Sequence, residues 1–197
     1  MFTGIVQAVG KILASEDHSG DIRLRIDTGS LNLDRLQLGD SIAVNGVCLT
    51  AVESAAQSFC ADVSAETLSA TSLGGLEAGS PVNLERSLTL SASLGGHLVS
   101  GHVDGVGRVT SLEPDARSTR IEFGIEKPLL RYVARKGSVT VDGTSLTVNA
   151  VSASGFSVNI VPHTLERTIM GQYKEGSLVN IEVDLVARYI ERLIEKS

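Results

Sequence analysis

The chain has 197 residues, of which 42% are hydrophobic and 20% charged, and it carries a formal net charge of −6. This composition is typical of a globular protein, and no cluster of Lys and Arg indicates nucleic acid or an anionic membrane surface as a partner. No apolar run approaches the roughly 20 residues that a membrane span needs, and the first residues do not have the pattern of a signal peptide.

The chain consists of two similar halves. A shift of 97 positions aligns residues 3–85 with residues 100–182 without a gap, and about 23 of the 83 pairs are identical. Chance similarity does not keep one register over such a length, so we expect the same folding unit twice. The segment that joins the units, residues 85–96, is short, so the two units should lie near each other.

The first half predicts a strand-rich unit. Alternating and β-branched residues indicate strands at 4–13, 22–26, 41–44, 58–63 and 82–86. Asn45-Gly46 is a strong signal of a tight hairpin turn, because both residues tolerate positive φ. The counterparts 97 positions on predict the same strands in the second half, with Asp142-Gly143 at the turn. About six short strands per unit favour a small closed barrel, which leaves no open edge.

Helical signals follow in the second half, and we expect two short helices in each unit. Residues 127–136 are good helix formers that end at Gly137, and residues 162–170 begin with a proline. The last segment, 185–196, has no counterpart in the first half. Its apolar residues fall on one helical face: Val186, Tyr189, Ile190, Leu193 and Ile194. This face packs either on its own barrel or in a helix bundle between subunits, and both alternatives are open.

The residue pattern excludes several classes of site. His97, His102 and His163 have no partner at metal-ligand spacing, and Cys48 and Cys60 match neither a metal site nor a disulfide framework. Gly-x-Ser-x-Gly is absent, and the Gly-rich stretches lack the strand-to-helix context of a dinucleotide site. We therefore expect no metal, a reducing cytoplasm, and a pocket of backbone amides and hydroxyls that binds a polar heterocycle.

The halves differ at three positions that bear on reactivity, and the aligned pairs are Cys48 and Ser145, Ile5 and His102, and Glu66 and His163. A buried Cys is often an inert small hydrophobe, and a lone His is often a structural donor, so a structural explanation is open at each position. The alternative is a division of labour, in which one pocket holds the donor ligand and the other holds the acceptor.

Five stretches of the chain resemble the riboflavin synthases of the alpha-chain type, the family with lumazine-binding repeats. They are residues 1–6, 44–50, 95–105, 142–148 and 162–168. The resemblance covers nearly the whole chain and keeps the motifs in order. It implies an all-β fold, with two similar six-stranded antiparallel Greek-key barrels in tandem and a C-terminal α-helix. The implied domains are residues 1–97 and 98–184 for the barrels and 185–197 for a trimerisation helix.

The resemblance also implies a reaction. Two molecules of 6,7-dimethyl-8-ribityllumazine would undergo dismutation by transfer of a four-carbon unit, giving riboflavin and 5-amino-6-(D-ribitylamino)uracil, without a metal or an organic cofactor. The reacting pair would lie between the N-terminal barrel of one subunit and the C-terminal barrel of its neighbour in a homotrimer. Association with a lumazine synthase capsid of the same pathway is a further possibility.

Substrate contacts are implied in both halves. In the first barrel they are Gly4, Ile5, Val6, Cys48, Leu49, Thr50, Asp62, Val63, Ser64, Ala65, Glu66 and Thr67. In the second barrel they are Gly101, His102, Val103, Ser145, Leu146, Thr147, Asn159, Ile160, Val161, Pro162, His163 and Thr164. Lys136 is expected to reach the pocket of another chain. The residues implied in catalysis are Phe2, Ser41, Cys48, His102 and Asp184.

The chemistry expected of these residues is proton transfer and ring activation. Loss of a proton from the 7-methyl group of one lumazine leaves a delocalised carbanion, and stacking the two rings supplies much of the acceleration. His102 could move protons near neutral pH, and Cys48 could add to or activate the electrophilic ring. Ser41 and Thr50 could hold the ring edge, and Asp184 could orient a partner.

Two alternatives do not involve turnover. A non-catalytic antenna protein of the same fold binds lumazine or a flavin for light emission, but such proteins lose the ligand site of the second barrel. Here the stretches 101–103, 145–147 and 162–164 are intact, which favours the enzyme. A storage or scavenging protein for flavins would need tight binding without turnover.

Overall fold

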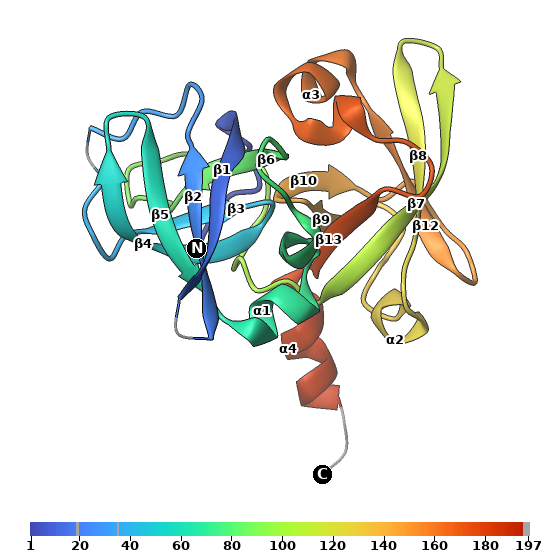
Figure 1. Ribbon diagram of the computed structural model, residues 1–197. Coiled ribbons are helices and arrows are strands. Elements are labelled where there is room, and N and C mark those ends of the chain that lie inside the picture. Colours follow the sequence, from blue (N-terminus) through green and yellow to red (C-terminus); the bar gives the residue numbers. More distant parts are fainter. Residues whose placement is uncertain (19, 35, 195–197) are drawn as a thin grey trace.

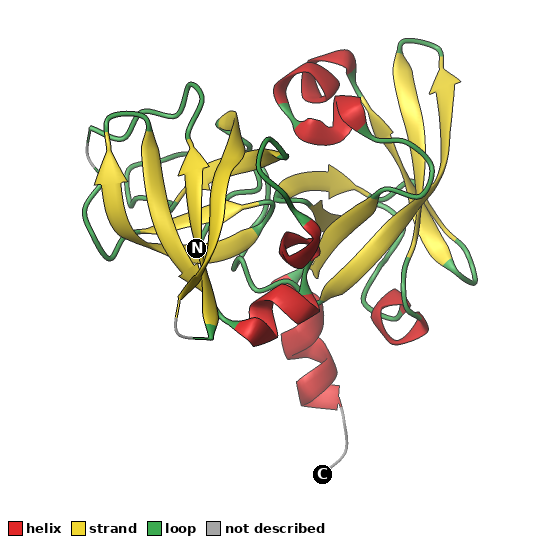
Figure 2. Ribbon diagram, viewed as in Figure 1, coloured by secondary structure: helices red, strands yellow, loops and turns green. Residues whose placement is uncertain are grey.

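The computed structural model describes residues 1–18, 20–34 and 36–194. Its strands form two lobes that lie side by side, one built from β1 to β6 and the other from β7 to β13 (Figure 1). Strands make up most of both lobes, and the helices are short pieces around them (Figure 2). The C-terminal helix α4 (Leu185–Ile194) projects away from the lobes, and the last residues of the predicted helix segment, 195–197, lie outside the described residues.

The first lobe is a closed six-stranded antiparallel barrel. Its strands follow the order β1-β2-β5-β4-β3-β6, and β6 closes the barrel by pairing with β1. Aliphatic residues from all six strands alternate inward and form one buried core. The strands are β1 (Ala8–His18), β2 (Asp21–Asp27), β3 (Ser41–Val44), β4 (Val47–Ala55), β5 (Ser58–Val63) and β6 (Pro81–Arg86).

The second lobe repeats this barrel with one interruption. Its sheet has the order β10-β9-β13-β7-β8-β12-β11, and β10 and β11 are two parts of the strand that corresponds to β4. Between them, the Asn149 N–H still donates to Ser157 O of β12 at 2.8 Å. The strands are β7 (Gly105–Asp115), β8 (Ser118–Gly124), β9 (Ser138–Val141), β10 (Thr144–Thr147), β11 (Ala150–Val151), β12 (Gly155–Ile160) and β13 (Leu178–Val183). The predicted tandem of Greek-key barrels is confirmed.

The helices are shorter than the sequence predicts. In place of a helix over 127–136, α2 (Lys127–Leu130) is followed by turns, because the N–H groups of Tyr132 and Val133 bond three residues back. The predicted helix 162–170 splits into α3 (Pro162–Arg167) and the 3-10 turn η2 (Ile169–Gln172). The first half has α1 (Ala65–Ala70) and η1 (Ser72–Gly75), whereas residues 30–33, which correspond to α2, form an irregular loop.

The strand starts at residues 4 and 101 are also wrong, since β1 begins at Ala8 and β7 at Gly105. The residues before each strand leave their own barrel and cross to the other one. Phe2 and Val99, which are equivalent in the repeat, bond to each other through their backbones at 2.7 and 3.1 Å. The alternation of apolar residues in these segments reflects this crossing rather than a continuous strand.

The two hairpin turns meet at the centre of the molecule. Asn45-Gly46 and Asp142-Gly143 all have positive φ, as predicted. A Cβ on Gly46 would lie 2.7 Å from the Gly143 N, and a Cβ on Gly143 would lie 2.8 Å from the Gly46 N. Only glycine permits this approach of two backbones, and the reciprocal distances show that the two halves are related by an approximate two-fold axis.

Buried asparagines join the barrels around this axis. The Asn83 Nδ2 donates to Asp142 O at 2.8 Å, and the Asn180 Nδ2 donates to Asn45 O at 2.9 Å. Their Oδ1 atoms accept from the backbone of the opposite half, at Ile169 of η2 and at Ser72 of η1, in bonds of 2.8 and 2.7 Å. Because these side chains are almost fully buried and bonded at both ends, the barrels are held in one relative position.

Candidate functional site

Each half contributes its leading glycine segment to the other half. The Ser145 N–H donates to Gly4 O at 2.7 Å, and the Cys48 N–H donates to Gly101 O at 2.8 Å. Gly4 and Gly101 have φ of 75 and 82. A Cβ on either would lie 2.6 Å from the Cβ of Ser145 or Cys48. Both the conformation and the space therefore require glycine where each segment reaches the opposite barrel.

Two buried glutamates hold these segments. Glu85 accepts from the N–H groups of Thr3 and Gly4 at 2.7 and 3.0 Å and from the Thr3 hydroxyl at 2.7 Å. Glu182 makes the same three bonds, with the same lengths, to Ser100 and Gly101. Burial raises the pKa of Glu85, while the bonds from Thr3 and Gly4 lower it. Sequence reasoning gave these glutamates no function, although their identity in the repeat was a signal.

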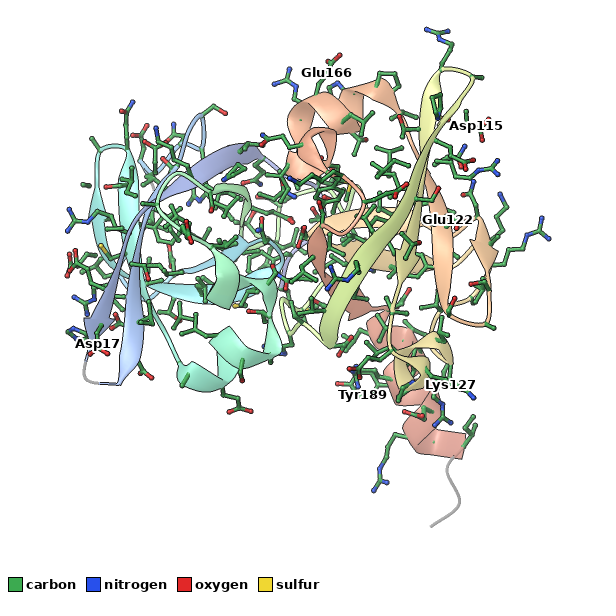
Figure 3. The ribbon with its side chains drawn as sticks, turned by 45° about the vertical axis from the view of Figure 1, so that its right-hand side comes forward. Asp17, Asp115, Glu122, Lys127, Glu166 and Tyr189 are labelled. Carbon is green, nitrogen blue, oxygen red and sulfur yellow. The ribbon has the colours of Figure 1, made fainter. Side chains whose placement is uncertain are left out.

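A groove of about 580 Å³ lies between the barrels beside Ser145. Residues 4–9 of the first half line one side, and the hydroxyl groups of Ser145 and Thr164, with His163 of α3, line the other. Glu166, which also lines the groove, points outward from α3 in Figure 3. This volume is within the range of small-molecule sites, and the lining combines aliphatic residues with several hydroxyl-bearing ones and with the charged Glu166 and Arg167.

The structure corrects the expected grouping of the site residues. We expected residues 4–6 to share a pocket with residues 48–50 and 62–67 of the first barrel, but they line the groove with Ser145 and α3 of the second. In the reciprocal arrangement, Gly101 lies against Cys48, and Val103 packs on the core of the first barrel. The cause is the exchange of the glycine segments. The groove beside Ser145 is thus built by both halves of the chain.

His97 forms a pair with Ser145 that the sequence did not reveal. The His97 Nδ1 lies 2.6 Å from Ser145 Oγ, and the Nε2 lies 3.2 Å from Thr140 Oγ1. Burial lowers the pKa of His97, against the opposing effect of Asp184 and Glu182, and therefore favours the neutral ring. His97 directly follows the joining segment 85–96 and lies outside the aligned ranges 3–85 and 100–182, so no difference between the halves could mark it.

The equivalent place in the first half is apolar. Cys48 is partly exposed and packs on a small cluster of Phe2, Ala43 and Val99. Phe2 was expected among the catalytic residues, but its side chain is fully buried. A Cβ on Gly101 would lie 2.9 Å from the Phe2 ring, so this ring supports the wall of the pocket from behind.

The other residues implied in catalysis do not gather at one point. His102 is exposed, and its N–H donates to Ser100 Oγ at 3.2 Å. Asp184 accepts from the Val186 N–H at 3.0 Å at the start of α4. Ser41 begins β3, where it pairs with Thr50. These three residues lie on different elements, and none of these bonds joins one of them to another.

Two of the expected contact residues have side chains that are already bonded within their own barrel. Asp62 accepts from the Arg23 guanidinium at 2.7 and 2.9 Å, and this bond lowers the pKa of Asp62. Asn159 donates to Asp115 at 2.8 Å and accepts from Asn149 at 3.0 Å. Any contact of these two residues with a ligand is therefore expected through the backbone.

Cys48 and Cys60 are both free thiols. Among the residues that the structure describes, no group of three or more His, Cys, Asp or Glu side chains could hold a metal ion. In the same part of the chain, no helix has the length and apolar character to cross a membrane.

Helix α4 contacts its own barrel through its polar face. Arg188 pairs with Asp104 and lies over the Tyr132 ring, 5.4 Å from its centroid, and Glu191 pairs with Arg131 at 2.8 Å. The apolar residues predicted to share a face are between 53% and 84% exposed: Val186, Tyr189, Ile190, Leu193 and Ile194. Figure 3 shows Tyr189 on the outside of the helix. Of the two alternatives, packing of this face on its own barrel is wrong.

Two Greek-key barrels with exchanged glycine segments and a small-molecule groove between them define the class of tandem lumazine-binding proteins, and the comparisons with known proteins agree. The family model of the lumazine binding domain matches twice, at residues 3–87 and 100–184. The structure is similar to that of LumP complexed with 6,7-dimethyl-8-(1'-D-ribityl)lumazine, with a TM-score of 0.83 and 25% identity, over 93% of this chain and 99% of that one. The LumP complex with riboflavin gives a TM-score of 0.85 and 26% identity over the same shares.

Among lumazine-binding proteins, the similar curated proteins are riboflavin synthases. The chain is 46% identical to the riboflavin synthase of Photobacterium phosphoreum over 98% of this chain and 89% of that protein. It is 44% identical to the riboflavin synthase of Mycobacterium bovis over the full length of both. The chain belongs to the riboflavin synthase family, as the sequence motifs predicted.

Proposed function

We propose that this protein is a riboflavin synthase. It converts two molecules of 6,7-dimethyl-8-ribityllumazine into riboflavin and 5-amino-6-(D-ribitylamino)uracil by moving a four-carbon unit from one to the other. The observation that carries the proposal is the 44–46% identity to riboflavin synthases along nearly the whole chain. The unequal surroundings of the equivalent residues Cys48 and Ser145 support it, since a dismutation needs the same compound bound as donor and as acceptor.

The second-half pocket has the groups for proton removal. A neutral His97 next to Ser145 can accept a proton, and Ser145 lines the groove where a ligand would lie. The first-half pocket offers the Cys48 thiol in an apolar setting, which suits addition to an electrophilic ring. We therefore assign deprotonation of the 7-methyl group to the Ser145 pocket and ring activation to the Cys48 pocket.

Two ligands bound within one chain would not meet. The groove beside Ser145 includes α3, whose counterpart in the first half is α1, and Figure 1 shows α3 on the upper side of the molecule and α1 on the lower side. Transfer of a carbon unit requires contact between the reacting atoms. The donor and the acceptor are therefore brought together between different copies of the chain.

The exposed apolar face of α4 supports assembly of these copies into a homotrimer. Because the polar face is paired with Asp104 and Arg131, the apolar face is turned outward, available to the same helix of neighbouring chains. Leu193→Glu should give monomers in light scattering, whereas Arg192→Glu on the same helix should leave the trimer intact. Trimers that persist in Leu193→Glu would contradict this assembly.

Lys136 is a further feature that fits an intersubunit pocket. It is exposed and has φ of 68, where the first half has Gly39 with φ of 94. A lysine in the left-handed region carries a cost of order 1 kcal/mol relative to glycine. Its presence there is explained if its ammonium group contacts the ligand of a neighbouring chain.

The decisive experiment is to mix the purified protein with 6,7-dimethyl-8-ribityllumazine and to follow riboflavin by absorbance. Turnover is expected. A protein that binds lumazine with stable fluorescence and forms no riboflavin would instead be the antenna protein, and tight retention of riboflavin without turnover would indicate storage. Cys48→Ala and His102→Ala should each lower turnover more than they weaken lumazine binding. A location in the cytoplasm, supported by the free thiols, and enclosure by a lumazine synthase capsid remain predictions.

A further inference from the structure

We propose that Thr140 is a positioning residue that holds the His97 imidazole in the tautomer with its proton on Nε2, so that Ser145 donates its hydroxyl proton to Nδ1. This inference rests on the proposed function, because it concerns the pocket to which we assign proton removal. Thr140 does not line the groove and acts on the ligand only through His97 and Ser145.

The two hydrogen bonds of the imidazole have unequal lengths. The bond between Nδ1 and Ser145 Oγ is 2.6 Å, and the bond between Nε2 and Thr140 Oγ1 is 3.2 Å. Hydroxyl donors make shorter bonds than N–H donors, whose donor–acceptor distances run from about 2.7 to 3.2 Å. The short bond therefore fits the Ser145 hydroxyl as donor, and the long bond fits the Nε2–H group as donor to Thr140.

The position of Thr140 fixes which ring nitrogen it meets. Thr140 is buried on β9, where its Cα partners are Ser145 on one neighbouring strand and Glu182 on the other. The Nε2 atom of His97 therefore has a buried hydroxyl as its partner, whereas Nδ1 is bonded to the residue that lines the groove. The charges of Asp184 and Glu182 favour the protonated ring, so they stabilise the positive charge that His97 gains when it accepts the Ser145 proton.

The tautomer decides in which direction a proton can move. When Ser145 donates to Nδ1, its Oγ keeps its remaining lone pairs for a proton from the ligand. The ligand C–H bond then breaks and leaves its electron pair on the carbon, a new bond forms between that proton and Oγ, and the original Ser145 proton passes to Nδ1. The charge that develops on His97 is positive and faces Glu182 and Asp184. With the proton on Nδ1 instead, Ser145 has no acceptor to which it can pass its own proton.

The tautomer can be measured without turnover. We would label the histidines with nitrogen-15 and record long-range proton–nitrogen correlations of the trimer, with His97 assigned from the signal missing in His97→Gln. The wild-type protein should have the proton on Nε2. Thr140→Val, which keeps the shape but removes the hydroxyl, should lose this preference, and Thr140→Ser should restore it. Thr28→Val removes an equally buried hydroxyl in the first barrel and should leave the His97 signals unchanged.

Steady-state kinetics provide the second readout. Thr140→Val should lower kcat about tenfold with little change in KM, Thr140→Ser should recover most of the loss, and Thr28→Val should match wild type. A wild-type His97 with its proton on Nδ1 overturns the proposal, whether or not Thr140→Val folds. A Thr140→Val protein in which only the His97 tautomer or only kcat changes also overturns the proposal. If wild type has the Nε2 proton but forms no riboflavin, the proposed function fails while the action of Thr140 on His97 stands.

Discussion

The two halves build the same pocket frame but place different groups at its reactive point. In both, a buried glutamate fixes a glycine segment, and the glycine carbonyl accepts from the N–H of a residue in the strand after the hairpin. In the first half this residue is Cys48 in an apolar cluster, and in the second it is Ser145 bonded to His97. The parts that shape the pocket are repeated, whereas the parts that react are not.

The source of this difference lies at the two-fold axis. Phe2 and Val99 are equivalent in the repeat, yet the Phe2 ring lies beside Cys48, whereas the ring beside Ser145 is that of His97. Ala43 and Thr140 are likewise equivalent, and only Thr140 can bond to an imidazole. In the first half, Cys48 packs with the Phe2 ring and Ala43, which are apolar. In the second half, Ser145 is bonded to the His97 imidazole, and this ring is bonded to Thr140, so the surroundings are polar.

The largest effect is expected from making the second pocket resemble the first. Ser145→Ala should lower kcat about 100-fold, and His97→Phe should lower it to a similar extent, because the two act as one proton-accepting unit. The double variant should therefore lose no more than about twofold beyond either single variant. The measurement is riboflavin formation at saturating lumazine, with lumazine binding followed separately by fluorescence.

The control for this cycle is Cys48→Ala combined with His97→Phe, since Cys48 lies in the other pocket. The loss of kcat in this double variant should equal the product of the losses in the two single variants. Multiplying losses for Ser145→Ala and His97→Phe would show that the two side chains do not act together, and the contrast between the halves would then not concern proton transfer.

A smaller effect is expected at the hairpin turns, where Asp142 stands opposite Asn45. Asp142 is buried, accepts from the Tyr173 hydroxyl at 2.5 Å and from the Asn180 N–H at 2.7 Å, and faces no cation in these bonds. Burial raises the pKa of Asp142 to about 7 from 3.8. The Tyr173 pKa is raised well above its usual value by burial and by Asp142, so this hydroxyl remains a donor.

The sign of the pH effect follows from this raised pKa. The folded protein binds the Asp142 proton more tightly than the unfolded chain, so the stability it contributes is present at low pH and is lost as pH rises from about 4 to about 7. Asp142→Asn removes this titration. Its free energy of unfolding should exceed that of wild type by about 1–3 kcal/mol at pH 8 and should equal it near pH 4. Urea unfolding at both pH values checks this. Asn45→Asp should have a lower free energy of unfolding than wild type at pH 8 and about the same value near pH 4.

The sequence predicted the fold well and the site in part. Barrels, hairpins and repeat register depend on local patterns such as Asn45-Gly46, and all of these are confirmed. The exchange of the segments at Gly4 and Gly101 was missed, because a repeat shows which residues are equivalent but not which copy they pack on. His97 was missed for a related reason: it lies between the aligned ranges 3–85 and 100–182, where the halves offer nothing to compare.

The smallest expected effect concerns the left-handed residue Lys136, which contrasts with Gly39 of the first half. Lys136→Gly should raise the free energy of unfolding by up to about 1 kcal/mol, because glycine relieves the positive φ at some cost in chain entropy. Ala116→Gly, at φ of 53 in the β7–β8 hairpin, is the matched control and should give a similar gain. If Lys136 also contacts the ligand of a neighbouring chain, only Lys136→Gly should raise KM for lumazine. Equal gains in the free energy of unfolding with an unchanged KM in both variants would show that Lys136 acts only as a turn residue. The difference between Lys136 and Gly39 would then have no part in catalysis.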